Sequence, residues 1–297
     1  MTHNGHISKL KAWWLAARPK TLPAAIAPVL VGSALAHAEG FFDWPPALAA
    51  LVGALLIQIG TNLANDYFDF LKGVDTAERK GPARALQSGL ISPKELQVGM
   101  VVVFGLAVLA GLYLAWVAGW PVVVIGALSL LCAVAYSGGP YPLASHGLGD
   151  AFVFLFFGLV AVGGTYYVQA LGFSSWALLA AVPVGALITA IIVVNNVRDI
   201  ETDALAGKRT LAVMMGPQAS KLEYAVLLGL AYEMPLVMWL NGWSAWVLLP
   251  FLSLPLGMWL TILLFRTKEG PAFNQLLAQT AQLALAFSAL FALGLIL

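Results

Sequence analysis

The sequence predicts an all-α integral membrane protein, a bundle of nine transmembrane helices that forms a single domain over residues 1–297. Composition is the first observation, because 61% of the residues are hydrophobic, only 10% are charged and the mean hydropathy is +0.88. A soluble core of this length could not bury so much apolar surface, so the surrounding solvent must be lipid. The other two observations are the recurrence of long apolar segments and the placement of the basic residues between them.

An α-helix crosses the hydrocarbon core of a bilayer with roughly 20 apolar residues. A polar, basic tail at residues 1–20 comes before the first such segment, which we interpret as a retained span because no clear cleavage site follows it. The nine apolar segments cover residues 21–38, 46–71, 96–117, 120–136, 148–171, 175–198, 221–240, 244–265 and 275–296. The second and sixth segments differ from the rest, since their last turns run into dense polar motifs.

The connections between these segments alternate in charge. Those near residues 118–120, 172–175 and 241–243 carry no charge, whereas the tail and three other loops together hold all 15 lysines and arginines. The positive-inside rule places this basic side in the cytoplasm, with the N-terminus inside and the C-terminus outside. A net charge of +1 offers no field that would attract nucleic acid. Orientation alone does not explain why acidic residues gather in the same two large loops.

Two acidic motifs, at residues 62–75 and 195–203, end the second and sixth segments about 130 residues apart. Both contain asparagine and aspartate at four-residue spacing, which lines side chains along one face of a helix. This suggests a weak internal repeat whose halves face one cavity, as metal sites between bundled helices do. The predicted metal ligands are Asn62, Asn65, Asp66, Asp69, Asp75, Asn195, Asp199 and Asp203.

Carboxylates at a membrane helix end are costly unless they are paired or bind something. The motifs offer only oxygen ligands, with no histidine or cysteine, which favours Mg²⁺ or Ca²⁺ over zinc or copper. Mg²⁺ commonly bridges carboxylates to substrate phosphates. The predicted diphosphate-binding residues beside the motifs are Lys72, Lys80, Arg84, Arg198, Lys208 and Arg209. The alternative is a set of salt bridges at the lipid headgroups, and Asp66 taken alone could be a surface charge.

At these residues the chain resembles the UbiA-type superfamily of intramembrane aromatic prenyltransferases, nine-helix proteins whose two aspartate-rich motifs bind Mg²⁺ and a prenyl diphosphate. The second motif matches their Asn-x3-Asp-x3-Asp pattern fully, whereas in the first motif Asp75 follows Asp69 by six residues. This departure resembles the menaquinone branch, whose members prenylate 1,4-dihydroxy-2-naphthoate. The same branch is indicated by the stretches at residues 17–24, 136–142, 147–150 and 207–211. The last three segments carry no specific resemblance.

The resemblance implies Mg²⁺-dependent transfer of a polyprenyl group from its diphosphate to the naphthoate, with loss of CO₂, at the cytoplasmic face of the cell inner membrane. It implies that the catalytic residues are Asp66, Asp69, Asp199 and Asp203. Arg18 and Lys20 are candidates to bind the acceptor carboxylate. Tyr136 and Tyr141 could face the acceptor ring, or could belong to an interfacial aromatic belt.

Two other functions are compatible with parts of this pattern. A prenyltransferase of the same superfamily that acts on 4-hydroxybenzoate, or on another aromatic acceptor, is the first. A secondary transporter is the second, because transporters also pair half-bundles that carry acidic residues at corresponding helices. Transporters place their polar residues near the middle of the membrane, whereas here they lie at helix ends beside basic residues. A diphosphate substrate fits that placement better.

Overall fold

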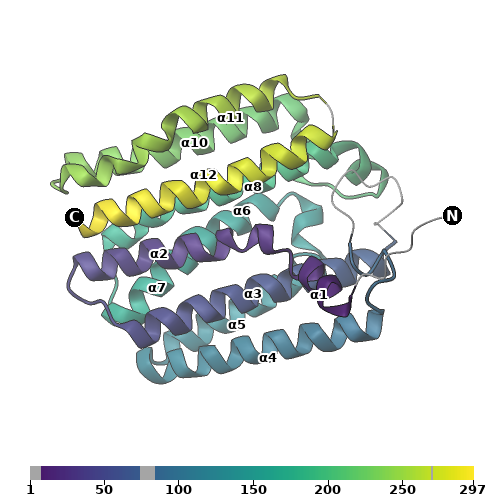
Figure 1. The fold of residues 1–297 in the computed structure, drawn as a ribbon, viewed down its shortest axis with the longest axis horizontal. Helices are drawn as coiled ribbons and strands as arrows, with labels where there is room; N and C mark the ends of the chain where they lie inside the picture. Colours follow the sequence, from purple (N-terminus) through teal and green to yellow (C-terminus); the bar gives the residue numbers. More distant parts are fainter. Residues whose placement is uncertain (1–7, 74–83, 269) are drawn as a thin grey trace.

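The computed structural model describes residues 8–73, 84–268 and 270–297. Throughout these ranges the chain forms helices, turns and loops, without a strand. The long helices lie side by side along one axis, and α1 and the C-terminal residue lie at opposite ends of the bundle (Figure 1). The predicted all-α fold is therefore confirmed, and the chain is a multi-pass membrane protein by the length and apolar character of its helices.

The helices follow the predicted segments closely. In the first half they are α1 (Lys9–Ala17), α2 (Pro23–Ala38), α3 (Trp44–Leu71), α4 (Pro93–Ala118) and α5 (Trp120–Ala135). One continuous helical span over Gly149–Ala170 follows, made of α6 (Gly149–Val153), a π-helical segment (Phe154–Val160) and α7 (Ala161–Ala170). The remaining helices are α8 (Ser175–Leu205), α9 (Leu211–Met215), α10 (Pro217–Leu240), a 3₁₀ segment (Ala245–Ser253), α11 (Leu254–Arg266) and α12 (Gly270–Ile296).

A helix is present at each of the nine predicted segments, but their capacity to cross a membrane differs. Within the described residues, seven helical stretches are long and apolar enough. The pair Lys9–Thr21 and Pro23–Ala38, bent by 49°, would make an eighth. Helix α5 has 16 residues, about 24 Å at 1.5 Å per residue, which is shorter than the ~30 Å hydrocarbon core. The count of nine crossings stays a prediction, as does the orientation of the termini.

Helix ends follow local sequence signals. Ser92 and Glu95 form a reciprocal capping box at the start of α4, where Pro93 occupies the first turn. The helix ends at Gly119, whose φ of +80° favours glycine. Helices α3 and α8 continue through the polar motifs, and α8 extends to Leu205, beyond the predicted end at residue 198. The acidic side chains are therefore presented on regular helices.

Helix α8 forms the centre of the core. In its most apolar stretch 72% of the residues are buried, against 11% in α4. It packs on α2, α7, α10 and α12, which share the largest hydrophobic cluster. Its backbone also touches that of the π-helical segment at Gly185, which has no side chain to keep the two helices apart. A Cβ there would lie only 2.9 Å from the Phe154 carbonyl oxygen and 3.0 Å from the Gly158 Cα. The second acidic motif is thus carried by the most enclosed helix.

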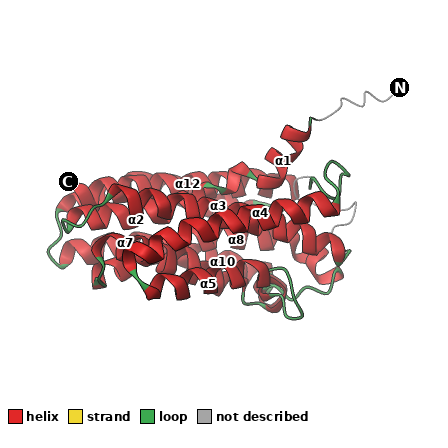
Figure 2. Cartoon of the chain, turned by 90° about the horizontal axis from the view of Figure 1, so that it is seen from below, coloured by secondary structure: helices red, strands yellow, loops and turns green. Residues whose placement is uncertain are grey.

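Helix α1 is an addition to the prediction, which gave residues 1–20 only as a polar tail. Figure 2 shows it projecting from one end of the bundle. Its Ala12 and Ala16 belong to a small separate core with Leu63 of α3 and Leu96 of α4. Helix α1 also packs against α4 through the Trp13 ring, which lies over Gly99. Any side chain at Gly99 would collide with this ring, because its Cβ would lie 2.4 Å from the nearest ring carbon. The helix ends at Arg18, whose backbone is left-handed.

Candidate active site

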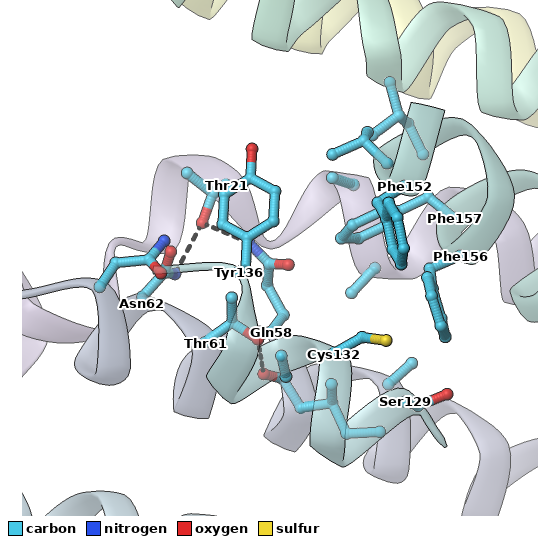
Figure 3. A pocket seen from close by; sticks show the side chains of 18 of the residues that line it. Thr21, Gln58, Thr61, Asn62, Ser129, Cys132, Tyr136, Phe152, Phe156 and Phe157 are labelled. Carbon is cyan, nitrogen blue, oxygen red and sulfur yellow. Dashed lines mark hydrogen bonds between the residues drawn. The ribbon is translucent and has the colours of Figure 1, made fainter. Parts of the chain in front are cut away.

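A cavity of about 1130 Å³ runs from the polar motifs into the apolar part of the bundle. Residues of α1 to α8 and of α12 line it. Along α3 the lining reaches from Asp69 to Ala50, which are 19 residues or about 28 Å apart. The deeper walls are apolar, and Figure 3 shows Phe152, Phe156 and Phe157 gathered on one side. The cavity thus joins a charged mouth to a long apolar interior.

The first motif lies on the last turns of α3 and holds its carboxylates against arginines. Asp66 is 1% exposed and pairs with Arg18 from the turn after α1. Arg84 binds both acids, with Nη2 at 2.8 Å from Asp69 Oδ2 and Nε at 3.5 Å from Asp66 Oδ1. Buried carboxylates need such charged partners, because an isolated charge would lose several kcal/mol of hydration.

The asparagines of the first motif hold neighbouring segments in place. Asn62 Nδ2 donates to the Ala17 carbonyl at 3.0 Å and to Thr21 Oγ1 at 2.9 Å (Figure 3). Asn65 Oδ1 accepts from Ser137 Oγ at 2.6 Å. These bonds connect α3 to the turn before α2 and to the loop after α5, the segments that carry Arg18, Lys20 and Tyr136.

The second motif lies on α8 and is organised around one arginine. The Arg198 side chain is 2% exposed and binds both oxygens of Asp199, with Nε at 2.8 Å from Oδ1 and Nη2 at 2.6 Å from Oδ2. Its Nη2 also donates to Asn195 Oδ1 at 2.8 Å, and its Nη1 donates to Asn274 Oδ1 of α12 at 2.7 Å. The Arg198 guanidinium therefore holds two predicted metal ligands, Asn195 and Asp199, in place.

The two motifs meet across Lys208, which follows α8 in the chain. Its Nζ lies 3.5 Å from Asp69 Oδ1 in the first motif and 3.9 Å from Asp203 Oδ1 in the second. One ammonium group therefore contacts both acidic clusters, which lie at the same end of the bundle. They are close enough to share a single small ligand.

Each of the four carboxylates that the structure describes in this site contacts at least one cationic side chain. The acids are Asp66, Asp69, Asp199 and Asp203, and their partners are Arg18, Arg84, Arg198 and Lys208. In the described part of the chain, no three acidic, histidine or cysteine residues converge tightly enough to hold a metal unaided. The oxygen donors nevertheless fit Mg²⁺, which normally uses one or two carboxylates and completes its shell with water and substrate phosphates.

The four predicted acceptor-binding residues separate into two groups. Arg18, Lys20 and Tyr136 line the cavity, and Tyr136 lies between the polar mouth and the phenylalanines (Figure 3). Tyr141 is 57% exposed, outside the cavity lining, and its ring stacks on His146 with the centroids 3.6 Å apart.

The predicted diphosphate-binding residues also differ in position. Arg84, Arg198 and Lys208 line the cavity. Lys72 does not line it, and its Nζ donates to the Ser137 carbonyl at 2.6 Å, while loss of hydration lowers the pKa of its ammonium group. Arg209 is exposed and away from the lining. The predicted ligand Asp75 and the predicted diphosphate-binding Lys80 lie outside the described residues.

Several residues of the site were not predicted. Gln58 precedes Asn62 by one helical turn, so the four-residue spacing of the motif could have indicated it, and its Nε2 donates to Thr21 Oγ1 at 3.1 Å. Asn274 could have been indicated only weakly, as a polar residue near the start of an otherwise apolar helix. The three phenylalanines gave none, because aromatic residues are common in apolar spans.

The fold and this site define a class of protein: a multi-pass membrane protein with an oxygen-rich site of paired acidic and basic side chains at the mouth of an apolar cavity. The chain belongs to the UbiA prenyltransferase family, whose sequence pattern matches residues 25–295.

Relatives within this family are similar over nearly the whole chain. A 1,4-dihydroxy-2-naphthoate octaprenyltransferase of Haemophilus influenzae is 38% identical, with 97% of each chain covered. The protein of the same name from Escherichia coli is also 38% identical, covering 98% of this chain and 97% of that one. The one from Mycobacterium tuberculosis is 40% identical over 83% of each chain.

Solved structures share the fold at low sequence identity. A UbiA homolog from Aeropyrum pernix K1 in its apo form gives a TM-score of 0.70 at 15% identity, covering 94% of this chain and 98% of that chain. A UbiA homolog from Archaeoglobus fulgidus bound to GPP and Mg²⁺ gives a TM-score of 0.67 at 16% identity, covering 96% of this chain and 99% of that chain. These likenesses support the helical architecture.

Proposed function

We propose that the protein transfers a polyprenyl group from a polyprenyl diphosphate to 1,4-dihydroxy-2-naphthoate, in a Mg²⁺-dependent reaction that releases CO₂ and diphosphate and yields demethylmenaquinol, the reduced form of demethylmenaquinone. The observation that carries this proposal is the meeting of two acidic motifs across Lys208 at the mouth of a long apolar cavity. The names of the relatives from three bacteria support the choice of acceptor.

Mg²⁺ bound here would neutralise the negative charge that grows on the diphosphate as its bond to the prenyl group breaks. The described residues that would hold it are Asn62, Asn65, Asp66, Asp69, Asn195, Asp199 and Asp203. Each of these carboxylates is paired with a cationic side chain. A metal–diphosphate complex would suit this site better than either partner alone, because the carboxylates would bind the metal and the cationic side chains beside them would be free to bind phosphate oxygens. Arg84 and Lys208 are the best placed for this exchange.

The apolar interior would protect the prenyl cation from water once the diphosphate leaves. The prenyl chain would extend along the roughly 28 Å of lining between Asp69 and Ala50. Phe152, Phe156 and Phe157 present aromatic rings to this space, and aromatic faces attract cations. The chain's own contribution to this step is exclusion of water and a favourable electrostatic surface.

The acceptor would bind with its carboxylate toward Arg18 and Lys20 and its ring toward Tyr136, which all line the cavity mouth. The ring carbon that bears the carboxyl group forms the new bond to the terminal prenyl carbon, and the carbon–oxygen bond to the diphosphate breaks. Loss of CO₂ then returns the electron pair of the carbon–carboxyl bond to the ring. We place this chemistry at the cytoplasmic leaflet of the inner membrane, where positive-inside orientation puts the basic loops.

The test uses purified full-length protein in detergent with a polyprenyl diphosphate and two acceptors, 1,4-dihydroxy-2-naphthoate and 4-hydroxybenzoate. We expect a prenylated, decarboxylated product from the naphthoate alone, loss of that product on addition of EDTA, and its return with excess Mg²⁺. Product from 4-hydroxybenzoate alone would reassign the acceptor. The absence of product from both acceptors, with folded protein and Mg²⁺ present, would refute a prenyltransferase function.

A further inference from the structure

One contact links the second acidic motif to the last helix of the bundle. Asn274, one turn into α12, accepts a 2.7 Å hydrogen bond on Oδ1 from Arg198 Nη1. The other hydrogen bonds of Arg198 go to Asn195 and Asp199 on its own helix. Among the described residues, Asn274 is therefore the hydrogen-bonding partner that ties this guanidinium to a second helix.

We propose that Asn274 is a positioning residue: it orients Arg198, and Arg198 in turn holds Asn195 and Asp199 in the arrangement that receives the metal. This inference rests on the proposed function, because it assumes that these two residues ligate Mg²⁺. It assigns a role in the site to α12, a helix whose sequence showed no resemblance to any functional motif.

The planar shape of the Arg198 guanidinium explains why a hydrogen bond from a second helix is needed to orient it. An arginine side chain has many rotamers, but its guanidinium is planar, so one bond at its far edge fixes the direction of the others. Here Nη1 is held by Asn274, which turns Nη2 toward Asn195 and Asp199. The Arg198 side chain is 2% exposed, so water cannot readily replace a lost partner.

The chemistry of asparagine suits this task. Its amide oxygen accepts from the guanidinium but carries no charge, so it does not compete with Asp199 for Arg198 and adds no further acid to the site. Asp199 would bind the metal, and Arg198 would keep this carboxylate oriented. Residues that hold metal ligands in this way typically change metal affinity roughly 10–100-fold when they are lost.

The experiment measures Mn²⁺ binding, with Mn²⁺ as a paramagnetic stand-in for Mg²⁺, by the loss of the free-ion EPR signal. Full-length protein in detergent is titrated in the presence of inorganic pyrophosphate. For Asn274→Ala we expect a Kd for Mn²⁺ that is roughly 10–100-fold weaker, with little change in melting temperature without metal. The matched control is Gln275→Ala, which removes the adjacent, exposed amide of the same helix and should bind Mn²⁺ like the wild type.

Asn274→Gln is the second variant and decides the outcome if the alanine variant does not fold. It keeps the amide oxygen but displaces it by one methylene group, so the Kd should weaken by a smaller factor. Wild-type affinity in the folded Asn274 variants would overturn the inference while leaving the metal site intact. A wild-type protein that binds no Mn²⁺ with pyrophosphate would instead overturn the proposed metal site, and the inference with it.

Discussion

Asp199 offers a way to separate the structural and chemical roles of one carboxylate. Its two oxygens accept hydrogen bonds of 2.8 and 2.6 Å from Arg198, whose side chain is 2% exposed. Asp199→Ala would leave that guanidinium buried with neither bond. Loss of two charge-assisted bonds, or of one partner of a buried ion pair, costs about 3–5 kcal/mol. The alanine variant should therefore unfold at a clearly lower temperature than the wild type.

Asp199→Asn should behave differently, because its amide oxygen still accepts from Arg198. We expect it to lose less stability than the alanine variant, because one of the two hydrogen bonds remains. Turnover should fall roughly 100-fold or more, since removing a metal-binding carboxylate costs about 3 kcal/mol of transition-state stabilisation at 1.36 kcal/mol per tenfold in rate. Thermal unfolding in detergent and product formation from the naphthoate measure the two effects. Wild-type stability in the alanine variant would refute the ion-pair argument. Near-normal turnover in the asparagine variant would refute the metal assignment.

Three further predictions concern the cationic side chains and their support. Lys208→Met should lower kcat/KM for the polyprenyl diphosphate about 10–100-fold in a steady-state assay, because it removes a charge that contacts both motifs. An unchanged kcat/KM would contradict a role of Lys208 in binding the diphosphate. Arg18→Gln should raise the KM for the naphthoate about tenfold and the KM for the diphosphate less; equal increases would argue against acceptor binding. Gly99→Leu should displace the Trp13 ring and loosen α1, which ends at Arg18, so the KM for the naphthoate should rise as it does in Arg18→Gln. Gly105→Leu is the control on the same helix and should leave this KM unchanged, because a Cβ at Gly105 meets nothing within 4 Å.

The sequence was sufficient to predict the helices that carry the site, because the signals are local. Apolar length located α3 and α8, and four-residue spacing placed the carboxylates of each motif on one helical face. Because the two motifs end corresponding helices on the basic side, they could be expected to face one cavity. The structure brings them together across Lys208, which the sequence predicted to bind the diphosphate but not to contact both motifs.

What the sequence could not supply depends on tertiary contacts. Arg198 was predicted to bind a diphosphate, yet its fork is occupied by Asn195, Asp199 and Asn274, a pairing that depends on α12 packing against α8. Helix α1 was missed because it is nine residues long and lies in a polar tail, so its stability depends on packing against α3 and α4.

The pairing of the four acids with cationic side chains bears on how the protein folds in the membrane. In many small metal-binding domains the ion supplies the folding energy, and chelators denature them. Here the arginines and the lysine pair with the carboxylates before any metal binds. We therefore expect the chain to fold in the bilayer without the ion, and a chelator to remove its activity reversibly without lowering its melting temperature.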